Sequence, residues 1–362
     1  MSKVDLFSYS PDPSVMKYRR VGDIGHVPRG VCAVVSVTPT DTCGIEADGV
    51  LRVMVVGDNA LSDSHEEGNC VIVTLGLDEE SGLLQVVSSD VTSCPTSVDA
   101  PDSLSLTRIG DIVYMLVGCT VEGDDRDDAM YIYDIPSDTW TKTEGESPAR
   151  QGHCALSVHD KLVVIGGGYG RETRQVWEYD TSGGWTRLTD SPLNLTYTAA
   201  ACHKGYVHIL GNASYNHRTH LVCQFIEGEQ EGEGERVPPT IEWERSSRGR
   251  VPFQAMSAAC VSVGKDMYFI GGDRHEGRVH VLDAEAAMTV SSTPSPSNGA
   301  ACDTIRGNIG THSAWRDEAD IPLDGIVGAA LIAPEGSDTC IMGRGTMLIH
   351  GEGGTLLYER AV

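Results

Sequence analysis

Five arginines between residues 150 and 274 are the side chains in this sequence best suited to binding chemistry. The chain has a formal net charge of −25, so these cations contrast with its overall composition. A guanidinium presents a planar fork of N–H donors that binds a carboxylate or phosphate through two hydrogen bonds. Ion pairs with neighbouring loop carboxylates are the alternative use of such arginines. The candidate binding residues are Arg150, Arg171, Arg218, Arg250, Arg274, Tyr215 and His275.

Other motifs with chemical potential lack part of what their chemistry requires. The acidic run 122–128 lacks the EF-hand spacing, with its glycine and terminal glutamate at the required positions, and is interpreted as a solvated loop. His217 and His220 have no cysteine or carboxylate nearby at metal-ligand spacing. The glycine-rich run 166–170 lacks the Lys-Ser/Thr pair of a phosphate-binding loop, and no Gly-x-Ser-x-Gly elbow occurs. We therefore predict no metal site, no cofactor and no catalytic residue.

The elements that position the arginines are clearest between residues 148 and 185. Ala155–Val158 and Leu162–Ile165 are short apolar runs, which are typical of strands buried on both faces. Trp177 and Tyr179 alternate at a period of two, and a glycine-containing turn then leads to Trp185. The stretch predicts four antiparallel strands, which need neighbours of the same kind to bury their faces.

The same pattern recurs before and after this stretch. A glycine ends the second predicted strand at Gly118, Gly167 and Gly211, with spacings of 49 and 44 residues (167 − 118 and 211 − 167). A further copy runs through Met267–Gly272 and Val279–Asp283. Periods of this length indicate propeller blades.

The order Pro-Arg-x-Gly-His (with one extra residue after Pro148), Gly-Gly, Tyr-Asp and Trp within 148–185 resembles the kelch motif. The resemblance implies an all-β fold: a six-bladed kelch-like β-propeller with four-stranded blades, closed by N- and C-terminal strands. We expect one domain over residues 1–362, with an inserted loop at 293–321. The fifth blade, from Pro252 to about Ser292, is expected to lack its tryptophan.

In kelch propellers, the loops before the first strand and after the second lie on one face, around a central channel. The resemblance therefore places the arginines on that face and implies a protein-interaction module that binds an acidic peptide. Two alternatives stay open. One is an enzyme on an anionic sugar, similar to sialic-acid mutarotases, with His153, His203 or Glu172 as acid or base. The other is a galactose-oxidase-like propeller that has lost its metal site.

Composition limits the classes of binding partner and the cellular compartment that we expect for the protein. A net charge of −25 argues against nucleic acid and anionic membranes. No run approaches 18 apolar residues, and the N-terminus has no apolar signal region. The eleven cysteines are an odd number, which favours reduced thiols and a cytoplasmic location. We also expect a monomer. Four of them lie in predicted first strands, where we expect buried structural thiols: Cys32, Cys154, Cys202 and Cys260.

Overall fold

The strands that can be described in a computed structural model of the chain form six separate antiparallel sheets. The structure describes residues 17–20, 29–39, 50–58, 70–77, 84–92, 103–118, 130–168, 172–180, 184–211, 219–226, 228, 239–244, 249–251, 253, 255–256, 258–263, 265–271, 278–291, 314–317, 324–331, 346–352 and 354–359.

Five sheets, called blades one to five, are each built from consecutive strands. Blade one contains β2 (Arg29–Ser36), β3 (Val50–Asp58), β4 (Cys70–Leu77) and β5 (Leu84–Thr92). Blade two contains β6 (Ser103–Ile109), β7 (Ile112–Gly118), β8 (Met130–Asp134) and β9 (Thr139–Lys142). Blade three contains β10 (Cys154–Val158), β11 (Lys161–Ile165), β12 (Val176–Asp180) and β13 (Gly184–Arg187), with the 3₁₀ helix η1 (Glu172–Arg174) after β11.

Blades four and five continue the series. Blade four contains β14 (Ala199–His203), β15 (Tyr206–Leu210), β16 (Thr219–Ile226) and β17 (Thr240–Trp243), and β18 (Gly249–Arg250) also pairs with β16. Blade five contains β19 (Ala259–Val263), β20 (Asp266–Ile270), β21 (Val279–Asp283) and β22 (Trp315–Asp317). The sixth sheet, called the terminal sheet, contains β23 (Asp324–Leu331), β24 (Thr346–Glu352), β25 (Gly354–Glu359) and β1 (Lys17–Arg20).

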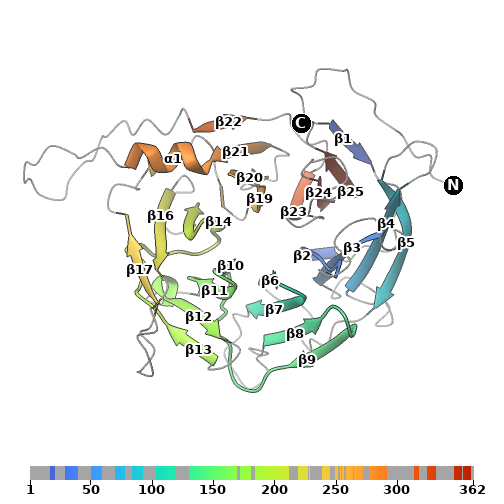
Figure 1. Cartoon of the computed structure of the whole chain (residues 1–362), viewed down its shortest axis with the longest axis horizontal. Coiled ribbons are helices and arrows are strands. Elements are labelled where there is room, and N and C mark those ends of the chain that lie inside the picture. The colour runs from blue at the N-terminus through green and yellow to red at the C-terminus, as the bar shows by residue number, and fades with distance from the viewer. Residues whose placement is uncertain are drawn as a thin grey trace, which may run out of the picture.

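The sheets are arranged around a common centre, with their first strands innermost (Figure 1). The first strands contact one another in the order β2, β6, β10, β14, β19 and β23, and β23 also contacts β2. In the terminal sheet, β1 pairs antiparallel with β25, so the two ends of the chain share one sheet. The expected all-β propeller is confirmed. The sequence also predicts an outer strand of the closing blade at Val4–Tyr9, which lies outside the described residues.

A cross-strand aromatic pair explains the repeated tyrosine and tryptophan. Tyr133 on β8 lies opposite Trp140 on β9, and Tyr179 on β12 lies opposite Trp185 on β13. The ring centroids are 5.0 Å apart in both pairs. Such pairs stabilise an antiparallel ladder beyond the area that they bury.

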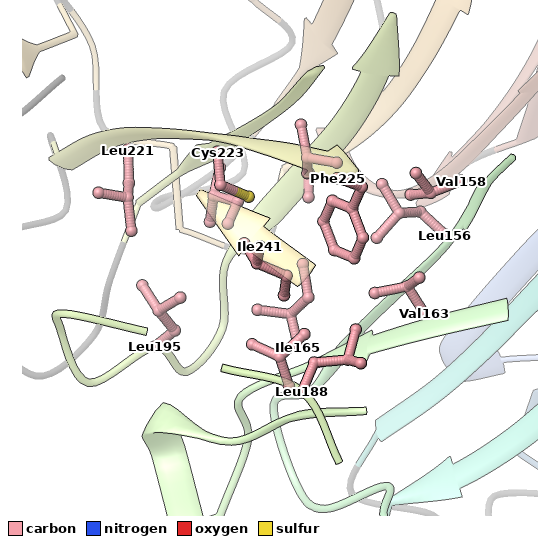
Figure 2. Packing of buried hydrophobic residues seen from close by; sticks show 14 residues of the cluster. Leu156, Val158, Val163, Ile165, Leu188, Leu195, Leu221, Cys223, Phe225 and Ile241 are labelled. Carbon is pink, nitrogen blue, oxygen red and sulfur yellow. The ribbon is translucent and has the colours of Figure 1, made fainter. Parts of the chain in front are cut away.

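The apolar cores lie between neighbouring blades. At the boundary of blades three and four, Val163 and Ile165 on β11 belong to one cluster with Leu221 and Phe225 on β16 (Figure 2). Successive residues of a strand point to opposite faces, so each blade contributes to the core on both of its sides. This arrangement explains why the second strands are apolar at nearly every position.

The fifth blade differs from expectation. The prediction that it lacks a tryptophan is wrong, because Trp315 on β22 lies opposite Leu282 on β21. A helix, α1 (Ala284–Ser291), follows β21 directly, and β22 comes from the segment 293–321 that we expected to be an inserted loop. The chain between α1 and β22 is too long for a repeat search to recognise the fourth strand. None of the helices among the described residues has the length and apolar character needed to cross a membrane.

Candidate functional site

Glycines bring the loops at one end of the blades into close contact. Each of three glycines that follow or end a second strand packs against the segment leading to the first strand of the next blade. A Cβ added at Gly118 would lie 2.5 Å from the carbonyl oxygen of Arg150, and one at Gly166 would lie 2.2 Å from that of Leu195. One at Gly211 would lie 2.8 Å from the carbonyl oxygen of Ala255. The recurrent glycine is therefore required by loop packing between blades.

A histidine links blades two and three at the same end. His153 immediately precedes β10, and its Nε2 lies 2.7 Å from Oγ of Ser105 on β6. Its Nδ1 lies 2.8 Å from the carbonyl oxygen of Arg150. A carbonyl oxygen can only accept, so Nδ1 carries the proton and Nε2 accepts the hydroxyl proton of Ser105.

The serine–histidine pair resembles half of a nucleophilic triad, but its environment indicates a structural role. His153 is buried, and burial lowers its pKa to about 4, with a further lowering effect from the Arg150 charge. A base with so low a pKa is poorly matched to proton abstraction near neutral pH. The pair therefore serves best as a clamp between two blades. The Gly-His dipeptide was visible in the sequence, whereas its partner Ser105 carried no signal.

Arg150 is the one predicted binding residue whose side chain the structure describes. Its guanidinium Nη1 donates to the carbonyl oxygens of Ser147, at 2.9 Å, and of Ala149, at 2.8 Å. The side chain thus turns back along the loop that carries His153. It is half-buried, so the loop conformation and the guanidinium depend on each other.

The other predicted binding residues are described partly or not at all. Arg250 lies on β18, opposite Thr219 of β16. The remaining predicted residues lie outside the described residues: Arg171, Arg218, Arg274, Tyr215 and His275.

Three of these arginines, Arg171, Arg218 and Arg274, lie in loops whose first and last residues are described. The amide of Gly166 donates to the carbonyl oxygen of Gln175 at 2.9 Å. Equivalent bonds of 2.9 Å join Gly211 to Thr219 and Gly271 to Arg278. In blades three, four and five, each segment therefore leaves the end of the second strand and returns to the start of the third at a closed base.

Residues considered for acid–base or metal chemistry are dispersed. His203 ends β14, and its Nε2 lies 3.7 Å from a carboxylate oxygen of Glu285 on α1. Glu172 begins η1 in blade three. Within the part of the chain that the structure describes, no three His, Cys, Asp or Glu side chains come together in a way that could hold a metal ion. His217 lies outside that part.

Comparison with known proteins agrees with the fold. Residues 149–192 match the family model described as "Kelch motif". A stretch of 84 residues is 34% identical to a protein named "Alpha-scruin" from Limulus polyphemus, and covers 22% of this chain. The match spans 9% of that relative's length. The matched motif contains His153, the closely packed Gly166 and the Tyr179–Trp185 pair. The packed glycine recurs as Gly118 and Gly211, and the aromatic pair recurs in blade two as Tyr133 and Trp140. Residues 149–192 thus carry a Kelch motif, within a chain whose described strands form a β-propeller fold.

Proposed function

We propose that this chain is a single-domain protein-interaction module that binds an acidic peptide or protein through the loops around its centre. The binding residues in this proposal are Arg150, Arg171, Arg218, Arg250, Arg274, Tyr215 and His275. Kelch propellers commonly serve as protein-binding modules, and this chain shares their motif. Arginine is well suited to the task, because one guanidinium binds a carboxylate through two parallel hydrogen bonds.

The observation that carries the proposal is that these loops all leave and rejoin their blades at the same end. The segments with Arg171, Arg218 and Arg274 each begin where a second strand ends, and close through a backbone bond from Gly166, Gly211 or Gly271. The loop with Arg150 enters blade three at the same end, because β10 begins beside the end of β11. Rigid strands that present several loops at one edge are a common basis for recognition.

We further infer that the ring has six blades and that the terminal sheet is the sixth. Its first strand, β23, contacts both β19 of blade five and β2 of blade one. Its outermost strand, β1, comes from the N-terminal part of the chain and pairs with β25. Pairing of both chain ends in one sheet is the expected way for a propeller to protect its edges.

The test compares binding before and after charge reversal of the proposed face. The wild-type protein and an Arg150→Glu/Arg218→Glu/Arg274→Glu variant are immobilised, and captured proteins are identified by mass spectrometry. A synthetic oligoglutamate peptide is then used as a competitor. We expect the wild type to retain partners that the peptide displaces and that salt weakens, and we expect the variant to lose them.

A control variant with the same change in charge separates the face from bulk electrostatics. Lys142→Glu/Arg187→Glu/Lys204→Glu reverses three exposed basic residues on β9, on β13 and in the turn after β14. It should retain the partners of the wild type. Both variants must keep the circular dichroism spectrum and melting temperature of the wild type. Capture of the same proteins by all three forms would overturn the proposal.

A further inference from the structure

Three histidines are buried at the boundary between blades four and five. His208 on β15 is 1% exposed, His220 on β16 is 4% exposed, and His280 on β21 is 7% exposed. The boundary between blades three and four has no such feature among its described core residues, which are aliphatic apart from Phe225, Cys223 and the partly buried Cys154, Cys202 and Trp243. Buried imidazoles are costly to protonate, so their concentration at one boundary makes that boundary chemically distinct.

Two of the histidines form a hydrogen-bonded pair. Nδ1 of His208 and Nε2 of His220 lie 3.1 Å apart. Nε2 of His208 is buried and has no hydrogen-bond partner among the described residues. A buried N–H without a partner is rarer and less favourable than an unpaired acceptor. We therefore place the proton on Nδ1 of His208, which donates to His220, and leave Nε2 as a bare acceptor.

A proton added to this pair would have no acceptor within the described boundary. Protonation at Nε2 of His208 would create a buried imidazolium with an unsatisfied N–H. Burial already lowers the pKa of His208 well below its usual value and that of His220 to about 4. His220 and His203 add to the effect at His208 through charge repulsion.

Aromatic packing ties the histidines to blade five. The ring of Phe253 stacks on that of His280, with centroids 3.7 Å apart and planes at 7°. Trp315 on β22 lies edge-on to both Phe253 and His220, at 5.4 Å and 6.1 Å. The contact between Trp315 and His220 crosses the boundary, so these two rings separate if the histidines must reach water.

The other charged and titratable groups around this boundary come from six elements and their adjoining turns. Glu285 on α1 is held ionised by Lys204, which lowers its pKa, and the pKa of Lys265 is raised by Asp283. The groups are His203 on β14, Lys204 in the turn after it, Tyr206 on β15, Cys260 on β19, Lys265, Asp266 and Tyr268 at β20, Asp283 on β21 and Glu285 on α1.

We propose that the boundary between blades four and five is an acid-sensitive seam, which opens at mildly acidic pH when His208 and His220 take up protons. The proposal is independent of any ligand on the loop face. On acidification, blades four and five separate locally while the other blades stay packed.

Linkage fixes the size of the response. In the open state each histidine has a pKa of about 6.5, whereas in the closed state protonation is suppressed. Each histidine then raises the opening equilibrium about tenfold between pH 7.5 and 5.5, so two raise it about 100-fold. His153 contributes about tenfold at the boundary of blades two and three. The boundary of blades three and four contains no such histidine among its described core residues and should not respond.

Hydrogen exchange followed by mass spectrometry tests, in the full chain, whether the boundary of blades four and five responds to pH more strongly than the other two. Protection factors, corrected for intrinsic exchange, are compared at pH 7.5 and 5.5 for peptides covering 199–226 and 249–283 and for peptides covering 130–168. We expect a loss of about 100-fold in the first group and about tenfold or less in the second. An equal loss across all peptides would show global unfolding and overturn the seam.

A variant isolates the two histidines. His208→Leu/His220→Phe removes both titratable groups and keeps the site apolar. It should remove the roughly 100-fold part of the pH dependence of exchange at 249–283 that these two histidines contribute, with His280 still in place, and should leave protection at pH 7.5 at or above the wild-type value. His159→Asn, in the exposed β10–β11 turn where φ is 48°, is the matched control and should behave as the wild type. Should the double variant fail to fold, the ranking of the wild-type peptides still decides the proposal.

Discussion

Nε2 of His153 and Oγ of Ser105 lie 2.7 Å apart across the boundary between blades two and three. The contact joins a residue of the kelch motif in one blade to the first strand of the preceding blade. It shows that the motif histidine serves the joint between blades, and that its role cannot be understood from its own blade alone.

Removal of the serine hydroxyl tests this joint. Ser105→Ala leaves Nε2 of His153 buried without a donor, which should lower the free energy of unfolding by about 1–3 kcal/mol. Urea denaturation followed by circular dichroism measures the change. Thr186→Ala on β13, where the side chain is exposed, is the control and should change stability by less than about 0.5 kcal/mol. Equal effects of the two substitutions would contradict a clamp role.

The same histidine predicts a pH dependence of stability. Its pKa is about 4 in the folded protein and about 6.5 when unfolded, so the unfolded chain binds the proton more tightly. The folded state therefore keeps its full stability with neutral His153 above pH 6.5, and it loses stability as the pH falls from 6.5 towards 4. The loss amounts to about 3 kcal/mol at most. The difference in unfolding free energy between wild type and His153→Gln, measured from pH 7.5 to 4, should shrink by this amount. Parallel curves for the two proteins would refute it.

The sequence was sufficient to predict the blades with an intact motif. Apolar second strands, the recurrent glycine and the Tyr–Trp pair are local features, and they placed β10 to β13 within a few residues. It was insufficient for the fourth strand of blade five, because α1 and the segment after it separate Trp315 from β21. The other blades repeat every 44 to 49 residues, so a fourth strand displaced by such an insertion falls outside the expected repeat.

Contacts between blades were harder to predict than the blades themselves. Ser105 and His153 are 48 residues apart, and nothing in the first strand of blade two marks its serine as a partner. His208 and His220 lie on adjacent strands, but His220 also packs against Trp315 from the next blade. Such pairs arise only when neighbouring blades are placed side by side.

Two glycines with similar backbone angles provide a matched test of loop packing. Gly166 has φ of 63° and its added Cβ would lie 2.2 Å from a backbone oxygen, whereas Gly110 has φ of 59° and open space around it. Gly110→Ala should cost only the left-handed strain, about 1–2 kcal/mol. Gly166→Ala adds a clash with rigid backbone and should cost about 1–3 kcal/mol more. Thermal or urea denaturation of both variants measures the difference, and equal costs would show that the close approach is unimportant.

The thiols of the first strands are predicted to be unreactive in the folded protein. Burial raises the pKa of Cys154 to about 12 and also raises that of Cys260, whose Sγ donates to the carbonyl oxygen of Ala200 at 2.6 Å. Since the thiolate is the nucleophile, alkylation at pH 8 should be about 1000-fold slower than in the unfolded chain. Light iodoacetamide applied to the folded protein, followed by heavy reagent in urea, resolves each cysteine by mass spectrometry. Cys223, which is also buried with a raised pKa, serves as the internal reference for a structural thiol. Labelling of Cys154 or Cys260 in the folded protein at the rate of a free thiol would mean that these strands present a reactive group towards the centre of the ring. A role beyond packing would then be required for them.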